Sequence, residues 1–174
     1  MRKVIVTEFI SADGIAEVEK LKVDWNDEMQ AFKEAELADS GAMLLGRRTY
    51  DIFAGSWPTR SGDFADKFNA IPRYVASTTL KELDWKPGEV LKGDLADAVA
   101  KLKQSDGGNI YVHGSLYLAQ QLLKLGLVDR VRLLSYPMAL GEGKRLFGLG
   151  EQHLTLISAK PFKNGVVALE YAPT

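Results

Sequence analysis

The stretch that decides the fold is AMLLGRRTYD, residues 42–51. Four apolar residues lead into Gly46, and two arginines, a threonine and an amphipathic segment follow. This order predicts a buried strand that runs directly into a helix. The unpaired N–H groups and the positive dipole end of a helix start attract an anion, and arginine adds a planar fork that suits phosphate oxygens. The stretch therefore indicates a phosphate site, with a solvated arginine pair at an ordinary helix start as the open alternative.

Length, composition and charge narrow the class of protein. The chain has 174 residues, 46% of them hydrophobic and 26% charged, so we expect one globular domain over residues 1–174. Its net charge of -1 gives no general attraction to nucleic acid or to an anionic membrane surface. No apolar run approaches the length of a membrane span, and the short run 4–10 predicts a strand rather than a signal peptide. We expect neither nucleic-acid nor membrane partners.

Several kinds of chemistry lack the residues they need. The chain has no cysteine, which excludes disulfides and thiolate metal ligands and fits a cytoplasmic location. Its only histidines are His113 and His153, too few for a histidine-rich metal site, so we expect no metal. No G-x-G-x-x-G or G-x-S-x-G motif is present, which argues against a standard Rossmann fingerprint and a serine hydrolase.

Hydrophobic periodicity and turn residues predict an α/β fold. The β-branched run 4–10 predicts a first strand, and apolar spacing predicts a helix over 27–38, capped by Asp24 or Asn26. Alternating strands and helices predict a mostly parallel sheet with helices on both faces and an antiparallel edge at the C-terminus. Further strands are expected at 42–45, 73–79, 90–91, 110–113, 131–140, 154–158 and 166–171, helices at 48–53, 95–104 and 116–125, and a short amphipathic turn at 64–70.

Small and polar residues follow four of the predicted strands, at 11–14, 46–49, 77–79 and 114–115. In sheets of this class ligands bind in the crevice beyond the carboxyl ends of the strands. These four exits are therefore expected to line one crevice that takes a dinucleotide or a phosphorylated metabolite. Hydroxyl residues at a strand end are also common turn formers, which leaves a purely local role open for residues 77–79.

Three ordered motifs resemble the dihydrofolate reductase superfamily: LGRRTY at 45–50, VAST at 75–78 and VHGS at 112–115. The match is closer to its branch that contains the C-terminal reductase domain of the bifunctional riboflavin-biosynthesis deaminase-reductase. Further matches to that branch lie at 11–14, 137–143 and 145–147. The resemblance spans nearly the whole chain. It implies a dihydrofolate reductase-like fold and an NADPH-dependent reductase, without the zinc deaminase half, because the chain has no H-x-E motif.

The resemblance also implies a role for each matching residue. Arg47 would hold the 2′-phosphate of NADPH, and Thr49 with the helix amides would receive the pyrophosphate. Gly114 and Ser115 would let the backbone approach the phosphates from the other side, where dihydrofolate reductases carry two glycines. The full set of implied cofactor-binding residues is Gly14, Ile15, Ala16, Gly46, Arg47, Arg48, Thr49, Ser77, Thr78, Thr79, His113, Gly114, Ser115, Leu116 and Tyr117.

The proton donor and the substrate contacts depend on the same resemblance. Reduction of a C=N bond needs a proton on nitrogen, and the catalytic candidates are Glu28, its neighbour Asp27, and Asp13 of the first loop. Asp27 and Glu28 are equally consistent with acids that favour a helix start. The substrate-binding candidates are Trp25, Phe32, Phe53 and Ser135, with a core role as the alternative for Phe32. His113 is equally consistent with a strand-end histidine that has no chemical role.

The sequence thus predicts an NADPH-dependent reductase of a small-molecule substrate, either a pteridine or a ribosylamino-pyrimidine. The alternative is a nucleotide- or pterin-binding module that keeps the fold without turnover, and a structural subunit is a third hypothesis. The apolar run 131–140 leaves room for a homodimer.

Overall fold

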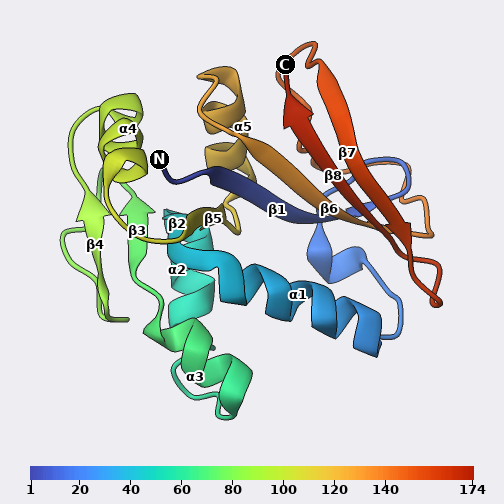
Figure 1. The fold of residues 1–174 in the computed structure, drawn as a ribbon, viewed down its shortest axis with the longest axis horizontal. Coiled ribbons are helices and arrows are strands. Elements are labelled where there is room, and N and C mark those ends of the chain that lie inside the picture. The colour runs from blue at the N-terminus through green and yellow to red at the C-terminus, as the bar shows by residue number, and fades with distance from the viewer.

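The computed structural model describes residues 1–174 as one α/β unit built on a single eight-stranded sheet (Figure 1). The strands lie in the order β4-β3-β2-β5-β1-β6-β8-β7. Their bounds are β1 Val4–Ser11, β2 Ser40–Gly46, β3 Arg73–Ala76, β4 Gly88–Leu91, β5 Asn109–Val112, β6 Arg130–Tyr136, β7 Leu154–Pro161 and β8 Val167–Pro173. The helices are α1 Asp27–Asp39, α2 Arg47–Ala54, α3 Asp63–Ala70, α4 Leu95–Gln104 and α5 Leu116–Lys124, with a 3-10 turn at Val18–Lys20.

The pairing pattern confirms the predicted fold class. The six strands from β4 to β6 pair in parallel, and β8 and β7 add an antiparallel edge next to β6. The hairpin between β7 and β8 turns at Asn164-Gly165, where Gly165 has a φ of +86°. All parallel strands therefore end at one edge of the sheet, as the polar strand exits require.

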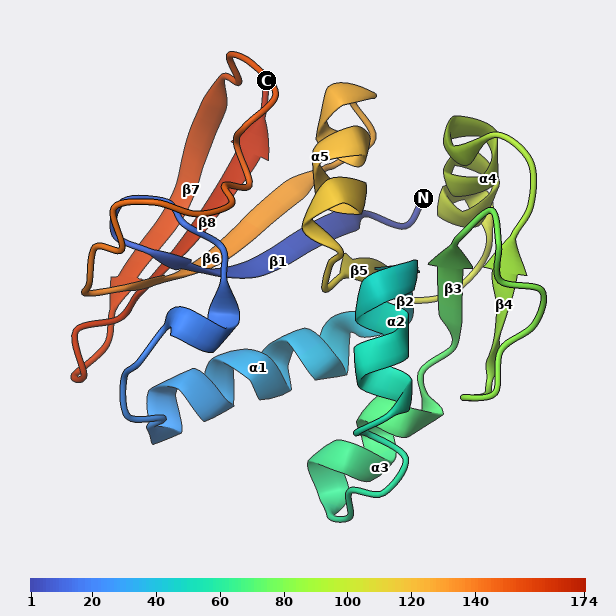
Figure 2. The ribbon, with the colours of Figure 1, turned by 180° about the vertical axis from the view of Figure 1, so that it is seen from behind.

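Helices cover both faces of the sheet, α4 and α5 on one and α1, α2 and α3 on the other (Figures 1 and 2). The α4–α5 face buries the largest apolar cluster, which includes Val6, Leu44 and Val112. On the other face, α2 and α3 pack over one aromatic-rich cluster and α1 over another. None of the helices is both long enough and apolar enough to span a membrane.

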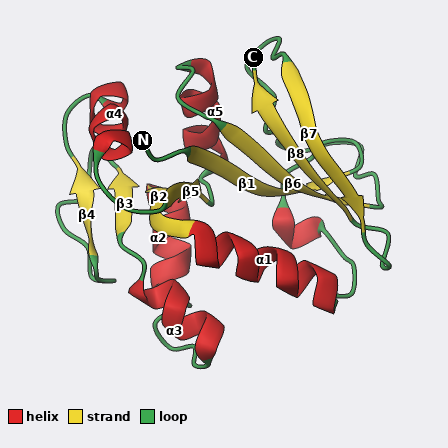
Figure 3. Ribbon diagram, in the orientation of Figure 1, coloured by secondary structure: helices red, strands yellow, loops and turns green.

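Several predicted bounds differ from the observed ones for local reasons. Residues 63–70 form a complete helix rather than a turn. Strand β3 ends at Ala76 because the Ser77 hydroxyl accepts a hydrogen bond from the Leu80 amide at 3.0 Å and closes a turn. Strand β6 ends at Tyr136, just before Pro137, which has no N–H to continue a ladder. Figure 3 shows how these loops follow the strand ends.

Strand β1 is paired unequally on its two sides. It pairs with β6 from Ile5 to Ser11, but its ladder with β5 stops at Val6. The last part of β1 therefore has a free edge on the β5 side, and the chain leaves β5 there through His113 and Gly114. This opening in the sheet edge is where the candidate site lies.

Candidate functional site

The exits of β2 and β5 touch each other through their glycines. The Gly46 amide donates a hydrogen bond to the Gly114 carbonyl at 3.0 Å. A Cβ on Gly46 would lie 2.9 Å from the Ser115 amide nitrogen, and one on Gly114 would lie 2.7 Å from Oγ1 of Thr49. Gly114 also has a φ of +113°, which favours glycine, and its peptide bond to Ser115 is cis. Only glycines fit this approach of the two backbones.

Two helices begin at this contact. Helix α2 starts at Arg47 immediately after Gly46, and α5 starts at Leu116 with Ser115 as its cap, since the Ser115 hydroxyl accepts a hydrogen bond from the Leu118 amide at 3.3 Å. The N–H groups and positive dipole ends of both helices lie beside the paired glycines. Two neighbouring helix starts and a side-chain-free backbone form a cradle suited to a pyrophosphate.

Arg47 links this cradle to the exit of β3. Its Nε lies 2.9 Å from both carboxylate oxygens of Asp51, and its Nη1 lies 3.4 Å from Oγ1 of Thr79. The Thr79 hydroxyl lies 3.5 Å from the Ser77 hydroxyl. The Arg47 side chain is 43% exposed, so its ion pair with Asp51 is a weak surface contact and leaves the guanidinium available to a stronger anion. Two sequence neighbours of these residues, Arg48 next to Arg47 and Thr78 next to Thr79, are also exposed.

The first loop is held by Asp13. Its carboxylate accepts hydrogen bonds from the Ser11 hydroxyl and from the amides of Leu140 and Gly141, at 2.5, 3.1 and 2.8 Å. These bonds lower the pKa of Asp13 to about 2, with the Ser11 bond as the largest cause. Asp13 is therefore ionised at neutral pH and ties two loops together. An ionised carboxylate does not favour Asp13 among the candidate proton donors.

The rest of that loop is anchored to the segment around Arg145. Ile15 is fully buried and pairs with Arg145 in an antiparallel bridge, and the Ala16 amide donates to the Lys144 carbonyl at 2.7 Å. The Arg145 guanidinium donates to the Asp13 carbonyl. Residues 14–16 thus form an ordered rim at the end of β1.

A cavity of about 880 Å³ lies on the α1–α3 side of the sheet, at the free edge of β1. Its wall is strongly aromatic: Phe53 packs edge-on against Trp57 and Phe68, and the ring centroids of Trp57 and Phe68 are 4.1 Å apart. Phe9, Trp25, Phe64 and His113 also line it. Such a wall suits a flat ring. Because His113 lines the cavity and Gly114 belongs to the cradle, the two adjoin.

Two of the residues that line the cavity have strongly shifted pKa values. Burial lowers the pKa of His113 to about 3, so its imidazole is neutral at physiological pH. Burial raises the pKa of Glu8 to about 7, and the nearby charge of Lys33 opposes the rise. Oε1 of Glu8 is sealed from solvent and has no hydrogen-bond partner. A carboxyl group in this environment can hold its proton near neutral pH.

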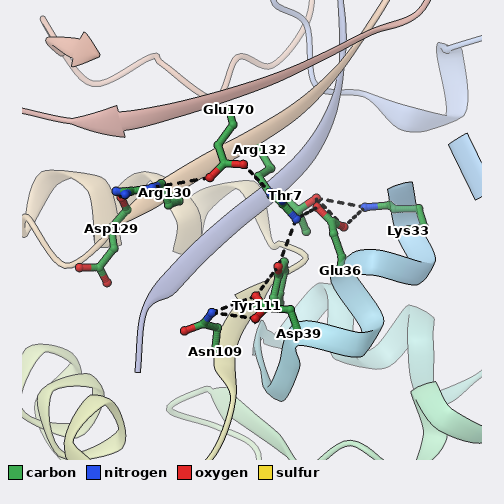
Figure 4. Close-up of polar contacts among 10 residues, drawn as sticks. All are labelled: Thr7, Lys33, Glu36, Asp39, Asn109, Tyr111, Asp129, Arg130, Arg132 and Glu170. Atoms are coloured by element: carbon green, nitrogen blue, oxygen red, sulfur yellow. Dashed lines mark hydrogen bonds and ion pairs between the residues drawn. The ribbon is translucent and has the colours of Figure 1, made fainter. Parts of the chain in front are cut away.

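Lys33 and Glu36 also line the cavity and form an ion pair with each other (Figure 4). The Lys33 ammonium lies 2.6 Å from Oε2 of Glu36 and 3.0 Å from the Thr7 hydroxyl, which itself donates to the Glu36 carboxylate at 2.9 Å. Arg132 lies 3.8 Å from the other Glu36 oxygen. Glu36 is therefore a fully satisfied carboxylate, unlike Glu8.

Some predicted site residues lie away from this cavity. Glu28 accepts a hydrogen bond from the Lys163 amide at 2.7 Å, in the β7–β8 turn, and Asp27 is exposed beside it. Neither lines the cavity, so a proton donor at Glu28 or Asp27 has no contact with it. Phe32 packs edge-on against Phe162 in the core, the alternative given for it above, and Ser135 lies on β6, paired with Val167 of β8. Neither residue lines the cavity.

The other predicted residues lie either at the cavity or at the start of α5. Trp25 and Phe53 line the cavity, and Trp25 is 48% exposed at its mouth. Leu116 is half-buried in the first turn of α5, and Tyr117, at 71% exposed, projects from it. Sequence reasoning missed Glu8, Lys33, Trp57 and Phe68. Glu8 stands out only as an acid in a strand of mostly apolar residues, which does not show whether it has a partner, and the other three carry no signal of a site.

Comparison with known proteins finds one family and two relatives that match nearly the whole chain. The family model of the RibD C-terminal domain matches residues 2–168. The uncharacterized protein YyaP of Bacillus subtilis (strain 168) is 30% identical over 179 residues, covering 98% of this chain and 94% of its own. YwjB, a second uncharacterized protein of that organism, is 26% identical, covering 95% of each chain.

Two solved structures share the fold. A protein from Shewanella sp. PV-4 that is named for riboflavin biosynthesis superimposes with a TM-score of 0.80 and 22% identity, and 99% of each chain is covered. A pyrimidine reductase-like protein from Corynebacterium diphtheriae superimposes with a TM-score of 0.68 and 17% identity, covering 99% of this chain and 92% of the other. Both confirm the fold predicted from the sequence.

Proposed function

The chain belongs to the RibD C-terminal domain family, a family of riboflavin-pathway reductases, and on that premise we propose that it is an NADPH-dependent reductase of a flat heterocyclic substrate. The observation that carries the proposal is the contact of Gly46 with Gly114 beside the starts of α2 and α5. A cradle that any Cβ would fill, next to an aromatic cavity, fits a dinucleotide whose reactive end meets a second ligand.

Each part of the cradle suits one part of NADPH. Arg47 would pair with the 2′-phosphate, exchanging Asp51 for a doubly charged partner, with Ser77, Thr78 and Thr79 beside the adenosine. Thr49 and the amides of α2 would hold the pyrophosphate from one side, and Gly114 with Ser115 from the other. The rim at residues 14–16 would border the nicotinamide. When bound, the cofactor supplies hydride.

The substrate would occupy the cavity of about 880 Å³, with its ring against Phe53, Trp57 and Phe68. A pteridine or a ribosylamino-pyrimidine has the flat, nitrogen-rich ring that such a wall accepts. The cavity also carries polar groups at Gln30 and Glu8 that can hydrogen-bond to ring nitrogens or amino groups.

The proposal is tested by following NADPH oxidation by the purified protein with dihydrofolate, dihydropterin and the ribosylamino-pyrimidine of riboflavin synthesis as substrates. Turnover with at least one of them, with NADPH preferred to NADH, is the expected result. Binding of NADPH without turnover of any of these would favour the binding module instead. Absence of NADPH binding would contradict the proposal.

A further inference from the structure

Glu8 occupies a position that the proposed function does not yet use. It lies on β1 two residues beyond the last residue paired with β5, and its own ladder partner is Leu133 of β6. It lines the cavity together with His113, whose next residue is Gly114 of the cradle. Glu8 is thus placed where the cavity and the cradle adjoin.

No protein group satisfies the Glu8 carboxyl. Oε1 is buried without a hydrogen-bond partner, and only desolvation and the charge of Lys33 perturb the group. A buried carboxyl oxygen without a partner lowers the stability of the fold unless a ligand supplies the missing hydrogen bond. A structural carboxylate would have a cation or amides around it, as Glu36 and Asp13 do.

The other acids near the site are committed elsewhere. Glu36 is paired with Lys33 and bonded to Thr7, and Asp13 is held ionised by three donors. Glu28 lies at the β7–β8 turn, and the imidazole of His113 is neutral at physiological pH. Glu8 is therefore the acid of the cavity whose carboxyl group has no partner in the protein.

The charges around Glu8 come from few elements. Helix α1 presents Lys33, paired with Glu36, and the chain after β5 presents the neutral His113. Strand β6 places the apolar Leu133 opposite it, with Arg132 turned to Glu36 and Glu170. The loop after α2 adds Arg60 to the cavity lining, where its guanidinium lies 4.3 Å from the centre of the Trp57 ring. Lys33 favours the carboxylate, burial favours the acid, and burial is the larger effect.

We propose that Glu8 is the catalytic acid of this protein, which hydrogen-bonds to a ring nitrogen of the bound heterocycle and transfers its proton to that nitrogen. The proposal rests on the reductase function proposed above. The Glu8 O–H bond breaks and an N–H bond forms with the electron pair of the C=N π bond, while hydride from the reduced nicotinamide forms the C–H bond. Glu8 is left as a carboxylate and recovers a proton from water.

The first test needs no cofactor. Quinoxaline, a flat bicycle whose nitrogens accept hydrogen bonds and do not ionise near neutral pH, is titrated against the tryptophan fluorescence of the whole protein. Its affinity for the wild type is expected to fall roughly ten-fold from pH 6 to pH 8, as the Glu8 proton is lost. Glu8→Gln, whose amide donates at every pH, is expected to bind it without this dependence. Glu89→Gln, an exposed site on β4, is the matched control and should behave as the wild type.

The second test is a ¹³C NMR titration of the glutamate carboxyls, with the Glu8 signal assigned by its loss in Glu8→Gln. A signal that titrates near pH 7 supports the proposal. A Glu8 carboxyl already ionised at pH 6, quinoxaline affinity independent of pH in the wild type, or no quinoxaline binding would each overturn it. These readouts decide on Glu8 even if NADPH does not bind.

Turnover supplies the third test once a substrate is found. Glu8→Gln is expected to lower kcat at least roughly a hundred-fold, the usual contribution of a positioned acid, and to leave NADPH affinity unchanged. An unchanged kcat would overturn the catalytic role.

Discussion

Lys33 and Glu36 lie one helical turn apart on α1 and form an ion pair, with 2.6 Å between the ammonium and the carboxylate. The Glu36 side chain is only 3% exposed, and its oxygens also receive the Thr7 hydroxyl. This pair neutralises a buried carboxylate beside the cavity. It also moderates the charge that Glu8 experiences from Lys33.

Glu36→Gln is expected to destabilise the protein by about 1–3 kcal/mol, because it leaves the partly buried Lys33 ammonium without its counter-charge. Urea unfolding followed by circular dichroism measures the loss. Glu34→Gln, an exposed site on the same helix, is the control and should change stability by less than about 0.5 kcal/mol. A loss of similar size in both variants would show that the pair contributes nothing specific.

Stability should depend on pH through Glu8. Its pKa is raised by folding from 4.5 to about 7, so between these values the native state binds more protons than the unfolded state. The free energy of unfolding from this group therefore falls as pH rises from about 4.5 to about 7 and is constant above that range. Relative to the wild type, Glu8→Gln is expected to gain on the order of 3 kcal/mol between pH 4.5 and pH 8.

The measurement is a series of urea unfolding curves of both proteins across that range. The difference between them isolates Glu8, because His113, whose pKa is lowered to about 3, contributes equally to both. A constant difference from pH 4.5 to pH 8 would contradict the raised pKa of Glu8.

Arg73 is a second buried charge, with a structural role. Its guanidinium is fully buried, stacks 3.7 Å from the ring of Trp85, and donates to the carbonyls of Asn69, Ile71 and Lys86. Arg73→Met is expected to cost roughly 3 kcal/mol, because three backbone carbonyls, one of them buried, lose their donor. Thermal unfolding checks this, with Arg60→Met, exposed at the cavity mouth, as the control. Equal melting temperatures for wild type and Arg73→Met would contradict the assigned role.

The close contact between the ends of β2 and β5 predicts that Gly46 cannot be replaced by a residue with a side chain. Gly46→Ala is expected to push the backbones apart, since its Cβ would lie 2.9 Å from the Ser115 amide, and to weaken NADPH binding at least roughly ten-fold. Gly55→Ala is the matched control, because its nearest neighbour would be at an ordinary 3.4 Å. Calorimetric titration of both folded variants compares them. Equal affinities would show that this approach does not form the cofactor site.

The fold was predictable from sequence because its signals are local. Strand β1 is rich in β-branched residues, Asn26, one of the two candidates, caps α1, and Asn164-Gly165 makes the hairpin turn. The strand, glycine and helix start at Gly46 were predictable for the same reason, since the three are contiguous in the sequence.

The cavity was less predictable, because its walls come from segments far apart in the chain. Glu28 lies at a helix start, as the sequence predicts, but the direction in which that start points depends on the packing of α1 against β6 and β8. Whether an acid is satisfied also depends on tertiary contacts. Glu36 has Lys33 and Thr7, Glu8 has none, and no spacing in the sequence distinguishes the two.

The central claim is that the guanidinium of Arg47 recognises a phosphate at the exits of β2 and β3. It is tested most directly by calorimetric titration of NADPH and NADH into the wild type and Arg47→Ala, with Lys124→Ala, at the exposed end of α5, as the control. The account predicts that NADPH binds the wild type more tightly than NADH, and that Arg47→Ala weakens NADPH alone by roughly 1.5–3 kcal/mol, or ten- to a hundred-fold. Equal affinities for the two cofactors in the wild type, or an equal loss for both in Arg47→Ala, would contradict it.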